Sequence, residues 1–211
     1  MVVNKDPYRN SAKWYDTLFE PFNTGLRGLC VKMLPPREGM FVLDMGCGTG
    51  SQLDVYQKAG CEVFGIDPSV AMIDLARQKL GNHANLCVGD ASRMPYGEGS
   101  FDLIVVSLVL HEISSRIRSV LVSESRRVLK KDGRLLVVDY HAGPLRFPKG
   151  WLLKSFITCA EIAAGSEHFK NYRQFMANKG VPALVAEHRL SVEMKKIVSG
   201  GNLGLFLLAS Q

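Results

Sequence analysis

Short apolar segments alternate with amphipathic ones through the middle of the chain. The segments at 41–46, 61–67, 101–110 and 134–140 predict β-strands, and residues 85–88 predict a weaker one. Helical spacing between them predicts helices at 52–59, 70–80 and 116–129. Strands that are apolar throughout and alternate with helices indicate a parallel sheet covered by helices on both faces.

The two ends of the chain follow other patterns. Residues 12–34 mix aromatic and aliphatic side chains at helical spacing, and we expect Pro21 and Gly25 to break this segment into two helices. Further helices are predicted at 151–164 and in the polar stretch that ends at Gly180. Residues 184–198 and 203–209 predict two strands joined by a tight turn.

Length and composition exclude several classes of protein. The 211 residues are 46% hydrophobic and 22% charged, which suits one globular domain. No apolar run approaches the roughly 18 residues of a membrane-spanning helix, and the first residues lack a secretory-signal pattern. Five cysteines without a CxxC pair disfavour a disulfide framework. We therefore expect a cytoplasmic protein.

Charge is distributed unevenly. Residues 41–110 carry eight acidic and four basic side chains, whereas residues 111–211 carry sixteen basic and eight acidic ones. A basic half suits nucleic acid, anionic lipid head groups or an anionic substrate. Cations on solvated helix faces produce the same balance, so charge alone selects no partner.

The segment VLDMGCGTGSQL (42–53) joins the first strand to the next helix through three glycines. Glycines in such a turn let the backbone bend sharply and lie against a ligand. The spacing is DxGxGxG rather than the GxGxxG of dinucleotide sites. Asp44 would repel a pyrophosphate, but it can pair with an ammonium group.

Two further carboxylates follow the next two strands. Asp67 can accept hydrogen bonds from both hydroxyls of a ribose, and Asp90 can bind the exocyclic amine of an adenine. Each taken alone is also typical of a loop-capping residue. Because the carboxyl ends of parallel strands meet at one crevice, the three acids together indicate a ligand with an amine, a ribose and an adenine.

With these motifs the sequence resembles the class I methyltransferases that use S-adenosylmethionine. The resemblance rests on VLDMGCGTG, FGIDPS, GDASRMPY, FDLIVVSLVLHE and RVLKKDGRLLVVDY, in this order over residues 40–140. It implies a Rossmann-like α/β fold with seven strands in the order 3-2-1-4-5-7-6, the last pair an antiparallel hairpin. We expect one domain over 1–211, made of an N-terminal helical lid (1–39), a cofactor-binding core (40–140), substrate lid helices (141–182) and a closing hairpin (183–211).

The resemblance also implies which residues hold S-adenosylmethionine and its product S-adenosylhomocysteine. Asp44 would lie near the amine, Asp67 would hold the ribose, and Asp90 would read the adenine edge. The other implied contacts are Gly46, Cys47, Gly48, Gly50, Pro68, Met72, Ala91 and Ser107.

A finer resemblance is to the ubiquinone and menaquinone biosynthesis methyltransferases and to small phospholipid methyltransferases. It rests on WYDTLFEPF (14–22), GSEHFKNYRQF (165–175) and SGGNLGLFLLAS (199–210). It implies a small, apolar or lipid-like methyl acceptor. The mixture of apolar residues and cations over 145–157 predicts either peripheral contact with a membrane or a buried helix with lysines at its ends.

Methyl transfer from a sulfonium requires alignment of the acceptor, and a general base only where the acceptor arrives protonated. The catalytic candidates are His111, Tyr15 and His141, and the candidates for acceptor contact are Tyr140, His168 and Tyr172. For His111 the alternative is a polar residue that caps the next helix.

Other chemistries fit less well. Ser115 stands where an HExxH zinc site that begins at His111 needs its second histidine, so no metal site is expected. Cys47 and Ser107 lack the context of a covalent nucleophile. A nucleic-acid methyltransferase stays an alternative because of the basic half, although SLVLHE is not the Asn-Pro-Pro-aromatic motif and no nucleic acid is expected. A non-catalytic cofactor-binding subunit is the other alternative.

Overall fold

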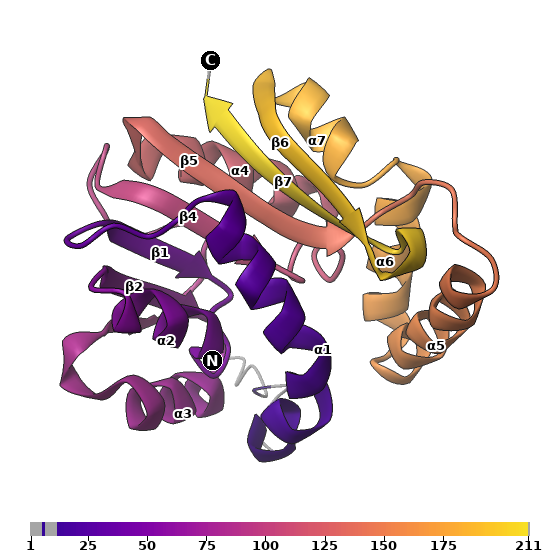
Figure 1. The fold of residues 1–211 in the computed structure, drawn as a ribbon, viewed down its shortest axis with the longest axis horizontal. Helices are drawn as coiled ribbons and strands as arrows, with labels where there is room; N and C mark the ends of the chain where they lie inside the picture. The colour runs from indigo at the N-terminus through magenta and orange to yellow at the C-terminus, as the bar shows by residue number, and fades with distance from the viewer. Residues whose placement is uncertain (1–5, 7–11, 211) are drawn as a thin grey trace, which may run out of the picture.

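The computed structural model describes the backbone of residues 6 and 12–210, and the side chains of residues 6 and 23–210. Seven strands form one sheet in the order β3-β2-β1-β4-β5-β7-β6 (Figure 1). Five strands pair in parallel: β1 (Phe41–Met45), β2 (Glu62–Asp67), β3 (Asn85–Val88), β4 (Phe101–Ser107) and β5 (Leu129–Tyr140). The antiparallel pair is β6 (Leu190–Val198) and β7 (Leu203–Ser210), with β7 beside β5. The expected strand order and closing hairpin are confirmed.

Alternate residues of each strand face opposite sides of the sheet. In β1, Val42 belongs to the apolar core on one face and Leu43 to the core on the other. The first core includes residues of α1 (Ala12–Met33), α2 (Ser51–Lys58) and α3 (Val70–Leu80). The second includes residues of α4 (Ser115–Val128), α6 (Ser166–Ala177) and α7 (Val181–Glu187). Helices therefore cover both faces, as the apolar strands predict.

The helix α5 (Lys149–Ala163) lies beyond the end of the sheet, beside α6 (Figure 1). Only a few of its residues are buried, Ile157 and Glu161 among them. Phe147, just before it, is 84% exposed, and Leu152 is 70% exposed. Among the helices that the structure describes, none has the length and apolar character needed to cross a membrane.

The N-terminal helix and one strand differ from expectation. Residues 12–33 form a single helix, so the expected break at Pro21 and Gly25 is wrong. The packing of its second half into the core outweighs the cost of glycine in a helix, which is about 1 kcal/mol. The strand β5 begins at Leu129, because the residues before Gly133 continue the sheet through an irregularity instead of forming a turn.

The segment before the closing hairpin also differs from expectation. Residues 181–187 form the helix α7, whereas a strand was expected from residue 184. Pro182 stands in its first turn, a position that proline favours. Val181 and Leu184, three residues apart, are buried against the core. That spacing and the preceding Gly180 are the helix signals that the sequence analysis missed.

Candidate functional site

A cavity of about 200 Å³ opens at the carboxyl ends of β1, β2 and β4. Eight of the residues expected at the cofactor line it: Asp44, Gly46, Cys47, Gly48, Asp67, Pro68, Met72 and Ser107. Gly50 is instead the N-cap of α2, and Asp90 and Ala91 do not line the cavity. Two of the three expected carboxylates thus meet at one crevice.

The loop that contains Gly46, Gly48 and Gly50, here called the glycine loop (residues 46–50), is held in place by backbone hydrogen bonds. Gly46 has a φ of 75°, and its N–H donates to Ile66 O at 2.8 Å. Gly48 has a φ of 51°, and its N–H donates to Asp67 Oδ2 at 2.9 Å. Positive φ values are those that glycine adopts at low cost, so the spacing of these glycines sets the path of the loop around the cavity.

Asp67 supports the loop after β2 as well. Its Oδ1 accepts a hydrogen bond from Ser69 N at 2.8 Å, and Ser69 in turn caps α3 by accepting one from Met72 N at 3.1 Å. Burial raises the pKa of Asp67, and the two backbone N–H groups lower it in part. The carboxylate therefore stands at the cavity wall with both oxygens already fixed in direction.

Asp44 is the buried acid of the cavity. It is 3% exposed, and its Oδ1 accepts no hydrogen bond from the residues that the structure describes. Burial and the nearby charge of Asp67 raise its pKa to about 7. A buried carboxylate oxygen without a donor is costly, so this position suits a ligand that brings a cation or an N–H group.

Asp90 makes a local contact. Its Oδ1 accepts a hydrogen bond from Ser92 N at 2.8 Å, which is the loop-capping arrangement. Ala91 packs against the edge of the core. The role of Asp90 at an adenine stays a prediction.

Several cavity residues were not anticipated. Asn23, Leu26 and Arg27 come from α1, which ends before β1 begins. No spacing rule links these residues to the glycine loop. The rest lie in or just after the glycine loop, or after β4: Thr49, Ser51, Gln52, Leu108, Val109, Glu112 and Ile113. The loop after β4 therefore forms more of the wall than Ser107 alone indicated.

A buried polar cluster adjoins this cavity, centred on His111. His111 is 3% exposed, and its Nδ1 lies 2.8 Å from Asp139 Oδ1. Burial lowers the pKa of His111, but the Asp139 carboxylate outweighs that effect and raises the pKa to about 9. His111 Nε2 lies 4.0 Å from Oε1 of Glu112, which lines the cavity. The cluster and the cavity are therefore neighbours.

The three candidates for acceptor contact surround His111. Ring centroids lie 4.5 Å apart for His111 and Tyr140, 5.7 Å for His111 and His168, and 6.4 Å for His111 and Tyr172. Glu161, which the sequence analysis did not single out, lies among them. Its Oε1 accepts a hydrogen bond from Tyr140 OH at 2.9 Å, and its Oε2 lies 2.8 Å from His168 Nε2.

Glu161 had one sequence signal, because it is the sole acidic residue of α5, a helix that is largely apolar. A carboxylate in such a helix requires a polar partner. Burial raises the pKa of Glu161, but His168, His111 and Tyr140 outweigh it and hold the pKa below its usual value.

The other two catalytic candidates lie elsewhere. His141 does not line the cavity, and its ring centroid lies 6.4 Å from that of Phe206. Burial and the nearby Lys195 lower the pKa of His141. Tyr15 belongs to α1, and its side chain lies outside the described residues.

Comparison with known proteins finds a matching family and several similar proteins. Residues 43–137 match the family described as "Methyltransferase domain". The chain is 27% identical to a demethylmenaquinone methyltransferase of Beutenbergia cavernae over 204 residues, covering 88% of this chain and 84% of the relative. It is 30% identical to a methyltransferase of Synechocystis over 165 residues, covering 78% and 73%.

A solved structure shows the same fold. An S-adenosylmethionine-dependent methyltransferase of Aquifex aeolicus superposes with a TM-score of 0.62, covering 86% of this chain and 88% of that one at 19% identity. The strand order, the glycine loop with its two carboxylates and the matched domain lead to one conclusion. The chain belongs to the class I S-adenosylmethionine-dependent methyltransferases.

Proposed function

We propose that the enzyme transfers the methyl group of S-adenosylmethionine to a small, apolar or lipid-like acceptor. The observation that carries this proposal is the position of α5. The same helix brings Glu161 to His111 beside the cavity and exposes Trp151 and Leu152 on its outer side. An apolar molecule bound against α5 would lie next to the cluster that Glu161 of this helix joins. The similarity to a demethylmenaquinone methyltransferase supports the same class of acceptor.

The cofactor would occupy the cavity at the ends of β1 and β2. Its ammonium would satisfy Asp44 Oδ1, which accepts no hydrogen bond from the described residues. Its ribose hydroxyls would bind Asp67, and Met72 would pack on the adenine. The glycine loop would lie against the methionine part, where a Cβ would obstruct it. Bound in this way, the cofactor supplies an activated methyl group on a sulfonium.

The acceptor would lie between the cavity and the His111 cluster. His111, Tyr140, His168 and Tyr172 approach one another there, and Glu112 joins the cluster to the cavity wall. Aromatic rings and imidazoles would orient an apolar ring or chain, while His111 or His168 would take part in proton transfer where the acceptor is protonated.

We also propose that α5 contacts a membrane surface. Phe147, Trp151 and Leu152 are exposed there, with the exposed cations Arg146 and Lys149 beside them. Apolar side chains can enter the head-group region while cations pair with lipid phosphates. Sedimentation with anionic vesicles should fall for Trp151→Ala and for Lys149→Glu, but not for Val120→Ala, an exposed apolar residue on α4. Equal sedimentation of all four proteins would contradict the contact.

A substrate screen tests the main proposal. Purified enzyme is offered demethylated quinone precursors, phosphatidylethanolamine, small thiols and small amines, and methyl uptake from labelled S-adenosylmethionine is measured. We expect uptake by an apolar acceptor and its loss in Asp67→Ala, with Asp74→Ala as the control on the exposed side of α3. Uptake confined to charged water-soluble amines, or uptake undiminished in Asp67→Ala, would contradict the proposal.

A further inference from the structure

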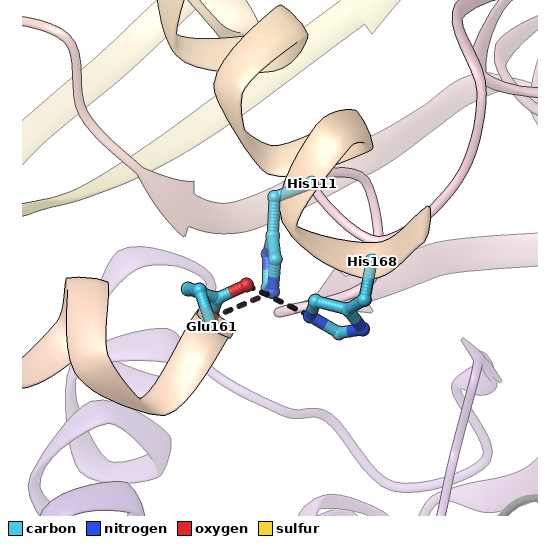
Figure 2. A group of neighbouring side chains, drawn as sticks. All are labelled: His111, Glu161 and His168. Carbon is cyan, nitrogen blue, oxygen red and sulfur yellow. Dashed lines mark ion pairs between the residues drawn. The ribbon is translucent and has the colours of Figure 1, made fainter. Parts of the chain in front are cut away.

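Three side chains from separate elements converge at the His111 cluster. Figure 2 shows Glu161 of α5 and His168 of α6 pointing toward His111, which follows β4. His111 Nε2 lies 3.6 Å from Glu161 Oε1, and His168 Nε2 lies 2.8 Å from Glu161 Oε2. Zinc holds nitrogen and oxygen ligands at about 2.0–2.2 Å, so neighbouring ligands of a tetrahedral ion lie about 3.4 Å apart. The observed separations lie on either side of that value.

Two of these side chains are oriented by further hydrogen bonds. Asp139 Oδ1 bonds to His111 Nδ1 at 2.8 Å, which leaves His111 Nε2 facing Glu161. Tyr140 OH donates to Glu161 Oε1 at 2.9 Å. Metal-binding histidines commonly donate their other ring N–H to a carboxylate, and ligating carboxylates are themselves hydrogen-bonded. The cluster has both supports.

Charge and burial also favour a cation between these groups. Asp139, Glu161 and Glu112 all place an oxygen within 4.0 Å of a ring nitrogen of His111. Glu161 is 5% exposed, and its Oε2 lies 2.8 Å from His168 Nε2. The buried cation Arg118 donates to backbone carbonyl groups rather than to these carboxylates. Buried carboxylates are costly unless a cation or a donor is paired with them, and a metal ion between these groups would supply that positive charge.

We propose that His111, Glu161 and His168 bind a divalent transition-metal ion beside the cofactor cavity. Two imidazoles and one carboxylate suit zinc or ferrous iron rather than magnesium or calcium, which prefer oxygen ligands. Three protein ligands leave a coordination position for a further ligand. The proposal departs from the expectation of no metal site, which rested on the absent second histidine of HExxH and on the lack of a CxxC pair.

The role of the ion rests on the proposed function. At the remaining position it would bind the oxygen or sulfur of a hydroxyl or thiol acceptor. The ion would favour loss of that group's proton to water, in place of proton transfer to His111 or His168, whose ring nitrogens would then bind the ion. The methyl group would then pass from the sulfonium sulfur to the acceptor, and S-adenosylhomocysteine would remain. Metal binding by the three side chains does not depend on which acceptor is used.

The test uses the whole chain, freed of metal by a chelator and then dialysed. Zn²⁺ binding is measured by competition with a chromophoric chelator, and Co²⁺ binding by its visible absorption, which reports the coordination geometry. The variants are His168→Ala and Glu161→Gln, with the exposed His83→Ala as the matched control. Thermal unfolding and cofactor binding are recorded for every protein.

We expect a single equivalent of Zn²⁺ or Co²⁺ to bind to the wild type and to His83→Ala. His168→Ala, whose side chain is 20% exposed, should stay folded and bind the metal at least about tenfold more weakly, since it loses one of three ligands. Failure of the wild type to bind either ion, or equal binding by His168→Ala, would overturn the metal site. It would favour a cluster whose side chains are held together by hydrogen bonds alone. Retained cofactor binding in that case would leave the proposed function standing.

Discussion

Gly46 and Val109 approach each other so closely that a Cβ on Gly46 would overlap Val109 Cγ2. Gly46 belongs to the glycine loop after β1, and Val109 belongs to the loop after β4. Both line the cofactor cavity. The two loops can pack this closely only because Gly46 has no side chain. Their contact brings the loop after β4, which includes Glu112, toward the glycine loop.

Gly46→Ala should destabilise the enzyme and weaken cofactor binding. The left-handed φ of 75° is unfavourable for alanine by about 1–2 kcal/mol, and the overlap with Val109 adds an overpacking cost of about 1–3 kcal/mol. Chemical denaturation measures the first effect and calorimetric titration with S-adenosylhomocysteine the second.

Gly39→Ala is the matched control for Gly46→Ala. Gly39 has a φ of 73°, but a Cβ there meets no atom within 4 Å. Its substitution should show the backbone cost alone. Val109→Ala combined with Gly46→Ala should recover part of the lost stability, because it removes the overlap. Equal losses in Gly39→Ala and Gly46→Ala would show that the contact with Val109 is unimportant.

Cofactor affinity should fall as the pH is lowered through neutrality. Burial raises the pKa of Asp44 to about 7 from the usual 3.8, so its carboxylate takes up a proton in the range where most aspartates stay ionised. The protonated form cannot pair with the ammonium of the cofactor. Affinity should therefore fall at most about tenfold for each pH unit below 7. Titration calorimetry from about pH 8 down to about pH 5.5 measures this dependence.

Asp44→Asn isolates that effect. It should bind the cofactor more weakly at neutral pH and show a flatter dependence over the same range. The raised pKa also means that the folded protein without cofactor binds more protons than the unfolded chain between about pH 4 and 7. The contribution of Asp44 to stability should thus decrease as the pH rises through that window. Parallel pH dependences of affinity in both proteins would exclude Asp44 as the titrating group.

The site was predictable where local rules act. The strand ends and the glycine spacing place Asp44 and Asp67 at one crevice, and Ser69 caps α3 as expected. The convergence of Glu161 and His168 on His111 depends instead on how α5 and α6 pack beyond the sheet, which periodicity does not encode. No spacing rule applies, because the three residues belong to separate elements.

The same limit explains the difference at Asp90. The rule for parallel strands places the residue after β3 at the crevice. The rule does not fix where the side chain points, and in the structure Asp90 Oδ1 accepts a hydrogen bond from Ser92 N. The direction of a loop side chain depends on the donors nearby, and these become known only from the folded chain.

Asp139→Asn should be strongly destabilising. Asp139 is fully buried, and its two oxygens face four donors: Leu110 N, His111 N, His111 Nδ1 and Tyr140 N. An asparagine amide would turn N–H groups toward some of these donors and leave them unsatisfied. We expect a loss of about 3 kcal/mol in the free energy of unfolding. Asp132→Asn, at an exposed position of the same strand, should unfold like the wild type. A small effect of Asp139→Asn would show that this loop tolerates rearrangement.

Tyr140→Phe should weaken metal binding without removing a ligand. The Tyr140 hydroxyl donates to Glu161 Oε1 at 2.9 Å and thereby fixes the direction of the proposed carboxylate ligand. Loss of such a supporting hydrogen bond typically lowers metal affinity about 10- to 100-fold. Tyr172→Phe is the control, because the Tyr172 hydroxyl accepts a hydrogen bond from Lys154 Nζ at 2.6 Å instead. Zn²⁺ competition should therefore separate the two variants, while Co²⁺ absorption should keep the same ligand set in both. Equal Zn²⁺ affinities in the two variants would mean that the hydrogen bond from Tyr140 does not orient Glu161 for metal binding.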